Sequence, residues 1–124
     1  MILGVGVDIV EIARIKNAVD KHSNFMNKLF NDEEIKYLNS RNCRPEFIAG
    51  RFAAKEAVSK ALGTGFRGFD FKDIFIDRTT EGKPTAVLRG KAKLLTKDYE
   101  SYKIHLSISH EISTAVAFAV MEVF

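Results

Sequence analysis

The feature that most constrains the fold is a long helix, which the sequence predicts over residues 45–62. Pro45 suits the first turn of a helix, and a glycine follows the last residue. Because residues four positions apart share one face, Ala53, Ala57 and Ala61 form a stripe of small side chains. Such a stripe lets a strand pack closely, so we expect the fold to be built around a strand lying on this helix.

Residues 2–10 are predicted to form the first strand of the chain. The segment is rich in β-branched residues, and Gly4 and Gly6 permit close approach of another backbone. An amphipathic helix is predicted directly after it, over residues 11–22. Asp8 therefore lies near a strand-to-helix junction.

The remaining elements mix helices and strands without a regular βαβ repeat. Asn31, with Glu34 three positions later, has the pattern of a helix start. The other predicted elements are strands over 71–78 and 85–89 joined by a turn at 81–84, a helix over 90–99, and strands over 103–109 and 113–123. This order favours an α+β fold over a doubly wound sheet.

Length and composition indicate one globular domain, residues 1–124. The chain is 46% hydrophobic and 28% charged, which is typical of such domains. Its single cysteine, Cys43, can form no internal disulfide, and this favours a cytoplasmic location. The apolar start lacks a basic segment and is interrupted by Asp8, and no apolar run is long enough for a membrane span. We therefore expect a soluble protein with no membrane partner.

The net charge of +3 favours anionic partners without choosing among nucleic acid, a phosphorylated cofactor and an acidic protein. Most of the cations near the first and longest helices are expected to be solvated. These cations are Arg14, Lys16, Lys21, Lys28, Arg41, Arg44, Arg51 and Lys55. The sequence has no glycine-rich phosphate loop, no dinucleotide fingerprint and no RNA-recognition pattern.

Asp8 is the first candidate for chemistry. A lone carboxylate in an apolar strand suits Mg²⁺, which takes one or two protein carboxylates and completes its octahedron with water and phosphate oxygens. The alternative is that Asp8 caps the helix that follows. Spacing alone favours the cap.

Glu56 and Lys60 form a second candidate site, on a stripe that also holds Phe52. They could form an ordinary exposed ion pair one helical turn apart. Their place beside the buried alanine stripe instead favours functional roles, because a carboxylate there needs a cation and a lysine needs an anion. A second magnesium ligand and a phosphate-binding ammonium would meet both needs.

The third candidate is the segment from His105 to Glu111. Strand alternation puts His105, Ser107 and Ser109 on one face and His110 on the other. These side chains could bind a phosphate or relay a proton. For each histidine alone, a structural or surface role is the simpler interpretation.

Three segments together resemble one enzyme family, the small single-domain 4'-phosphopantetheinyl transferases of the holo-acyl-carrier-protein synthase type. They are Gly6-Val7-Asp8-Ile9 followed by Arg14-Ile15, then Arg51-Phe52-Ala53-Ala54-Lys55-Glu56-Ala57-Val58-Ser59-Lys60-Ala61 with Gly63-Thr64-Gly65, then Ser107-Ile108-Ser109-His110. The order and spacing match from end to end, and the middle segment is the most specific.

The resemblance implies a fold and a reaction. The fold is a mostly antiparallel sheet packed against one long and several short helices. The reaction moves the 4'-phosphopantetheine of coenzyme A (CoA) to a serine of acyl carrier protein for fatty acid biosynthesis and requires Mg²⁺. Asp8 and Glu56 would hold Mg²⁺, and Lys60 would neutralise the transferred phosphate. Two-domain relatives carry another acid where this chain has Val10, so the metal would keep more water. A water or Glu56 would take the serine proton.

The resemblance also implies contacts and assembly. Lys60, Lys83, Pro84 and His110, with Arg51, would bind CoA. Arg14, Lys21 and Phe25 would meet the carrier protein. The family forms homotrimers with active sites between subunits, and the apolar stretches 66–76 and 115–124 exceed what one small core can cover.

Two other functions remain as alternatives. A magnesium-dependent nucleotide pyrophosphohydrolase would direct Asp8, Glu56 and Lys60 at water instead of serine. A small basic nucleic-acid-binding module would use cations as phosphate contacts, in contrast to the transferase, for which we expect no nucleic-acid partner. Those cations are Arg14, Lys16, Arg41, Arg44 and Arg51.

Overall fold

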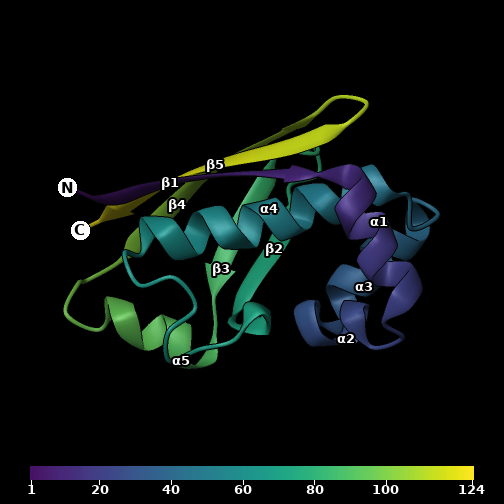
Figure 1. Ribbon diagram of the computed structural model, residues 1–124. Helices are drawn as coiled ribbons and strands as arrows, with labels where there is room; N and C mark the ends of the chain where they lie inside the picture. The colour runs from purple at the N-terminus through teal and green to yellow at the C-terminus, as the bar shows by residue number, and fades with distance from the viewer.

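The computed structural model describes all of residues 1–124, and one long helix runs through the middle of the molecule (Figure 1). The elements in chain order are β1 (Ile2–Glu11), α1 (Ile12–Lys21), α2 (Phe25–Leu29), α3 (Asp32–Ser40), α4 (Pro45–Ala61), the 3₁₀ turn η1 (Phe71–Asp73), β2 (Ile74–Arg78), β3 (Pro84–Leu88), α5 (Gly90–Lys93), the 3₁₀ turn η2 (Leu94–Thr96), β4 (Tyr102–His110) and β5 (Thr114–Val123). The predicted α+β class, with antiparallel strands and one long helix, is confirmed.

The main sheet has three antiparallel strands in the order β1-β5-β4, and α4 lies along one of its faces (Figure 1). The central strand presents Ala115, Ala117 and Ala119 toward the helix, and all three are buried. Small side chains on both elements bring sheet and helix close together. Asp8 of β1 is paired with Ala117 in the middle of this sheet.

Two glycines of β1 set the distance between the strand and α4. A Cβ atom on Gly4 would lie 2.2 Å from the carbonyl oxygen of Ala61, and one on Gly6 would lie 2.0 Å from that of Ala57. No side chain fits in either place. The expectation that a strand packs closely on the alanine stripe is therefore confirmed, and the structure identifies that strand as β1.

The second sheet is the β2-β3 hairpin, which packs against α4 and β4. Buried apolar side chains form a core of 17 residues between α4 and the two sheets, and a core of 8 residues where α1, α2 and α3 cover the start of α4. Both cores contain side chains of α4, so the rest of the chain packs around this helix.

Several predicted boundaries are wrong for local reasons. Glu11 remains in the strand because it pairs with Thr114. The strand predicted from residue 71 starts three residues later, since a capping box between Asp70 and Asp73 folds that segment into a 3₁₀ turn. The helix predicted over 90–99 stops early, where the Thr96 hydroxyl donates to the Lys93 carbonyl.

Helix α2 was missed by the sequence analysis. It has five residues and no side-chain cap at its start. In contrast, the helix start predicted at Asn31 is confirmed by a complete capping box with Glu34.

Candidate active site

Asp8 and Lys60 meet where β1 crosses α4. The Lys60 Nζ atom donates to Asp8 Oδ1 at 3.2 Å and to the Val7 carbonyl at 3.0 Å. The Asp8 side chain is 17% exposed and that of Lys60 is 51% exposed. The glycine-to-alanine packing below them fixes the separation of the two elements, so the pair is built into the backbone geometry.

Asp8 is not a helix cap. It lies in the strand, paired with Ala117, and the N-cap of α1 is Glu11, which makes no side-chain capping bond. The capping interpretation is therefore wrong, and the carboxylate is left to face α4.

Glu56 faces the same place from α4. Partial burial raises the pKa of the Glu56 carboxyl, the negative charge of Asp8 raises it further, and Lys60 acts in the opposite direction. No ion pair joins Glu56 to Lys60, because the lysine pairs with Asp8 instead. The interpretation as a plain surface ion pair is therefore wrong. Two carboxylates that repel each other in a half-buried site call for a cation.

The residues present fit a hard cation with an open coordination sphere. No group of three or more His, Cys, Asp or Glu side chains gathers anywhere in the chain, so this site offers two protein carboxylates only. Mg²⁺ accepts that arrangement, since it keeps several waters and takes the rest of its ligands from a substrate phosphate. Val10 adds no oxygen here and packs into both cores.

Arg51, Pro84 and His110 come together elsewhere, around a cavity of about 240 Å³. The His110 ring packs edge-on against Phe47 with centroids 5.8 Å apart. Lys83 lies in the adjoining turn with its side chain exposed. The family resemblance implied that these residues bind CoA together with Lys60, which does not line this cavity.

The cavity also contains residues whose role the sequence analysis missed. The Tyr37 ring lies close to three guanidinium groups, with the Cζ atoms of Arg51, Arg78 and Arg41 at 4.4, 4.6 and 5.7 Å from the ring centroid. Burial lowers the pKa of Arg51. The Nε atom of Arg41 is buried without a hydrogen-bond partner. A wall of arginines and aromatic rings suits a planar anionic ligand. The place of Arg78 just before the predicted turn was the only signal for it in the sequence.

The carboxylate site and the cavity lie on opposite sides of α4. Successive residues of a helix are rotated by about 100°, so Arg51 and Lys60, nine positions apart, point in roughly opposite directions. One chain therefore carries two half-sites, one at Asp8, Glu56 and Lys60 and one at the cavity.

Helix α1 presents the cations expected to meet an acidic partner. Arg14 and Lys21 are exposed, take part in no ion pair and lie on one face. Lys16, in contrast, pairs with Asp20 at 3.0 Å. Phe25 begins α2 and is half-buried.

The other cations that the sequence analysis named do not form one continuous surface of unpaired charges. Arg44 pairs with Glu46 at 3.5 Å and stacks on Phe47. Arg51 is partly buried in the cavity wall. This dispersal disfavours a nucleic-acid-binding module.

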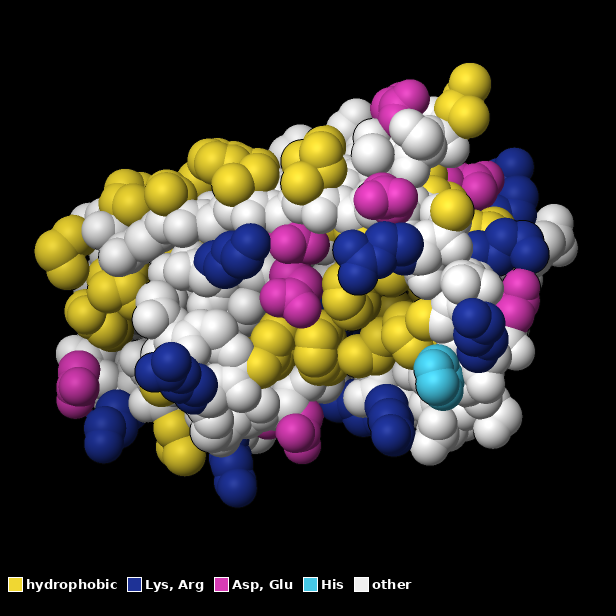
Figure 2. Space-filling model, viewed as in Figure 1, with side chains coloured by type: hydrophobic (Ala, Val, Ile, Leu, Met, Phe, Trp, Pro, Cys, Tyr) yellow, Lys and Arg dark blue, Asp and Glu magenta, His cyan; other side chains and the backbone are white.

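The outer face of the main sheet is strongly apolar along β1. Figure 2 shows a row of hydrophobic side chains along this edge, and Val5, Val7 and Ile9 are 58%, 53% and 69% exposed. Phe118 of β5 adds a ring that is 47% exposed. At the edge of the same face, His105 pairs with Glu122 at 2.9 Å instead of reaching a half-site.

The two apolar stretches that the sequence indicated, 66–76 and 115–124, supply only a small part of this exposed surface. Residues 66–70 form a bent loop, not a strand, and Phe69, Ile74, Phe75 and Ile76 are buried within the single chain. Only the outward side of 115–124 remains exposed. The apolar excess is real, but it lies mainly on β1, because alternate residues of that strand face away from α4.

Residues 4–119 match the 4'-phosphopantetheinyl transferase superfamily. The holo-[acyl-carrier-protein] synthase of Clostridium kluyveri is 67% identical over 99% of this chain and 92% of its own length, and that of Clostridium acetobutylicum is 55% identical over the full length of both. Among solved structures, the synthase of Neisseria meningitidis superposes with a TM-score of 0.87 at 33% identity, covering 98% of this chain and 99% of that one. The synthase of Bacillus anthracis gives 0.81 at 38% identity, covering 98% and 97%.

The chain belongs to the 4'-phosphopantetheinyl transferase superfamily. Within it, the chain is an enzyme of the holo-[acyl-carrier-protein] synthase class, as its sequence indicated. No helix has the length and apolar character needed to cross a membrane.

Proposed function

We propose that residues 1–124 form one transferase domain that moves the 4'-phosphopantetheine of CoA to a serine of acyl carrier protein, with Mg²⁺, in the cytoplasm and for fatty acid biosynthesis. The observation that carries the proposal is the meeting of Asp8, Glu56 and Lys60 at one crossing of strand and helix. CoA as the donor is supported by the synthases of Bacillus anthracis, in complex with CoA (3',5'-ADP), and of Helicobacter pylori, in complex with coenzyme A.

The three residues have separate tasks in the proposed reaction. Asp8 and Glu56 would hold Mg²⁺, which would supply positive charge beside the CoA pyrophosphate. The serine oxygen forms a new bond to the phosphorus of the pantetheine arm as the bond to the bridging oxygen breaks. 3',5'-ADP leaves. Lys60, 51% exposed and already turned toward Asp8, neutralises the phosphate.

The serine proton has two candidate acceptors. One is the carboxylate of Glu56 itself. The other would be a water molecule in the same half-buried site.

The cavity is proposed to bind the nucleotide of CoA. Arg51 and His110 would contact its phosphates, and Pro84 and Lys83 would lie against the nucleoside. Tyr37 and Arg78, which the sequence analysis did not select, extend the same wall.

One CoA must reach both half-sites, and α4 separates them within one chain. We therefore propose that a neighbouring subunit supplies the cavity, in a homotrimer whose interface includes the exposed apolar face of β1. Arg14, Lys21 and Phe25 remain for the carrier protein, beside the carboxylates and away from the cavity.

A mass measurement tests the function. Apo carrier protein, CoA and Mg²⁺ are incubated with the enzyme, and the carrier is weighed. Transfer adds one phosphopantetheine to the carrier. Loss of CoA in the absence of carrier protein would identify a pyrophosphohydrolase instead, and a steep salt dependence of nucleic-acid binding would support the binding module.

Glu56→Gln tests the metal assignment. A metal ligand should give a loss of orders of magnitude in rate and weaker Mg²⁺ saturation, with the fold intact. Near-wild-type activity at low Mg²⁺ would contradict the assignment.

Complementation tests the shared site. Glu56→Gln and Arg51→Ala variants should each be inactive, but trimers mixed at equal amounts should recover about a quarter of the wild-type rate, since a site is intact only when each neighbour supplies its unaltered half. If every site lay within one chain, mixing would restore nothing.

A further inference from the structure

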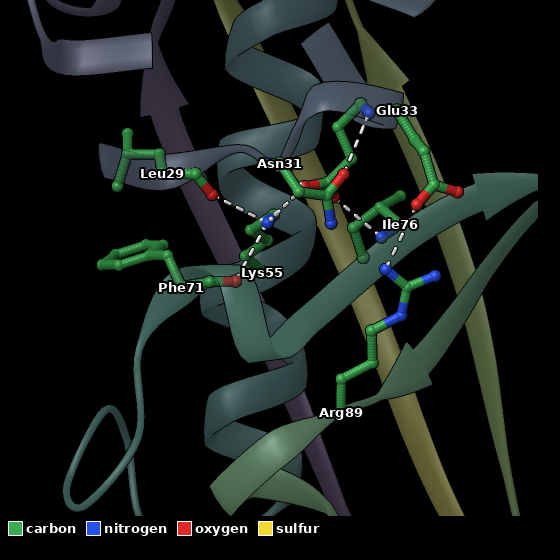
Figure 3. A network of polar contacts seen from close by, with 8 residues as sticks. Leu29, Asn31, Glu33, Lys55, Phe71, Ile76 and Arg89 are labelled. Atoms are coloured by element: carbon green, nitrogen blue, oxygen red, sulfur yellow. Dashed lines mark hydrogen bonds and ion pairs between the residues drawn. The ribbon is translucent and has the colours of Figure 1, made fainter. Parts of the chain in front are cut away.

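Lys55 is the most deeply buried charged residue of the chain, and the proposed reaction gives it no task. It precedes Glu56 in α4, yet its side chain is 0% exposed and points away from the carboxylate site. Its Nζ atom donates to the Leu29 carbonyl at 2.8 Å, the Phe71 carbonyl at 2.9 Å and Glu34 Oε1 at 2.8 Å (Figure 3). All three donors of the ammonium are therefore used.

Glu34 completes the network from the other side. Its side chain is 1% exposed, and besides Lys55 it accepts from the Asn31 backbone N–H at 3.0 Å and the Ile76 backbone N–H at 2.9 Å. Charges and hydrogen bonds are thus balanced within the core. The network ties the end of α2, the start of α3 and η1 to one atom of α4, and Glu34 extends it to the middle of β2.

One of these attachments, the one to Phe71, reaches the surroundings of Glu56. The ring of Phe71 stacks on Phe52 with centroids 5.7 Å apart and on Phe66 with centroids 3.8 Å apart. Phe52 lies one helical turn before Glu56 on the same stripe, so these three rings form an apolar wall beside the carboxylates. Helix α2, held at its last residue by Lys55, packs against η1.

The carboxylates themselves are held by other contacts. Glu56 is fixed by the packing of α4 on the glycines of β1, and Asp8 by its place in the sheet. Loss of the Lys55 ammonium would release Phe71 and α2 while leaving Asp8 and Glu56 where they are. If Lys55 only stabilises the fold, its loss should not act on one part of the site alone. If Lys55 positions Phe71 and α2, its loss should alter that side of the site and leave the carboxylates unchanged.

We propose that Lys55 is a positioning residue, which holds the wall of Phe52, Phe66 and Phe71 and the adjoining helix α2 so that the carrier protein can seat beside Glu56. This inference rests on the proposed function, since it names the carrier as the ligand of that surface. Lys55 touches no reacting atom and acts through the carbonyls of Leu29 and Phe71.

The experiment compares Lys55→Met with the double variant Glu34→Gln/Lys55→Met. The single variant leaves a buried carboxylate without its cation and should be strongly destabilised. The double variant removes both charges and should recover much of the melting temperature, but it still leaves both carbonyls without their donor. We expect its KM for the carrier to rise by about tenfold or more, with the KM for CoA and the Mg²⁺ half-saturation close to wild type.

Hydrogen exchange gives a readout that does not depend on turnover. In the double variant, amides of α2 and of residues 71–76 should exchange faster, while those of α4 keep their protection. Phe71→Leu keeps the backbone carbonyl and the network but removes the ring, and should raise the carrier KM in the same way.

A wild-type carrier KM in the double variant or in Phe71→Leu would overturn the inference. If the wild-type enzyme transfers phosphopantetheine and these variants match it, only the role of Lys55 is wrong. If the wild-type enzyme adds nothing to the carrier, the proposed function itself fails.

Discussion

Gly6→Ala should damage the site without touching any polar group in it. The new Cβ would lie 2.0 Å from the Ala57 carbonyl oxygen, 2.8 Å from the Ala61 nitrogen and 2.9 Å from the Lys60 Cβ. Two of these atoms belong to the backbone of α4, so no side-chain rotation can relieve the contact. The strand must therefore retreat from the helix, and Asp8, two residues later, retreats with it.

The size of the effect follows from the contact. Reaching an ordinary 3.4 Å contact from 2.0 Å requires a shift of about 1.4 Å, and overpacking on this scale costs about 1–3 kcal/mol. For a domain of this size the melting temperature should fall by roughly 4–12 °C. A misplacement of about 1 Å in a catalytic group can cost about 100-fold in rate, which is the loss we expect in kcat/KM well below the melting temperature.

Gly68→Ala is the matched control. Gly68 has φ of 84° with nothing within 4 Å of a Cβ, so alanine there costs only backbone strain, about 1–2 kcal/mol. The two variants should be destabilised to a similar degree, but only Gly6→Ala should lose activity and Mg²⁺ affinity. If both retain wild-type turnover, close strand-to-helix packing does not position Asp8 and the reasoning is refuted.

Three other predictions concern separate parts of the molecule. Reversing Arg14 and Lys21 to Glu should raise the KM for carrier protein and leave CoA binding nearly unchanged, as steady-state kinetics will show; an unmoved KM would mean a merely solvated face. In sedimentation, the wild-type protein should have a mass near that of three chains, and Ile9→Asp should give folded monomers. A wild-type protein that is monomeric and still active would rule out the shared site. Hydrogen bonds from Ser113 and Thr114 lower the pKa of Glu111 to about 2 from 4.5, so its stabilising effect is complete above pH 4.5 and is lost as the pH falls toward 2. Denaturation of wild type and Glu111→Gln across that range should show a flatter pH dependence in the variant, and parallel curves would contradict it.

The sequence predicted the two sides of the main packing contact from local patterns, but not that these two elements meet. The alanine stripe and the glycines Gly4 and Gly6 are complementary features on two elements, and each is visible in a short window. The capping box at Asn31 was equally visible, since all of its hydrogen bonds lie within four residues.

The second role of Glu34 was invisible for the opposite reason. Its bonds to Lys55 and Ile76 span 21 and 42 residues, and no local rule links those positions. The wall of Tyr37 and Arg78 was missed in the same way, because it forms only when α3 meets the end of β2. The family resemblance implied active sites between subunits, and the rotation along α4 is the observation that separates the two half-sites within one chain.

The packing of α4 limits the substitutions that this enzyme can accept during evolution. Ten of its seventeen residues are buried, and its partly exposed positions include Arg51, Phe52 and Glu56, which already serve the cavity, the wall or the carboxylates. Almost no position of this helix can therefore change without disturbing the packing or one of these groups. Adaptation to a new carrier protein or an altered donor should therefore arise in α1 and in the turn before Pro84, where exposed side chains can change without disturbing the helix.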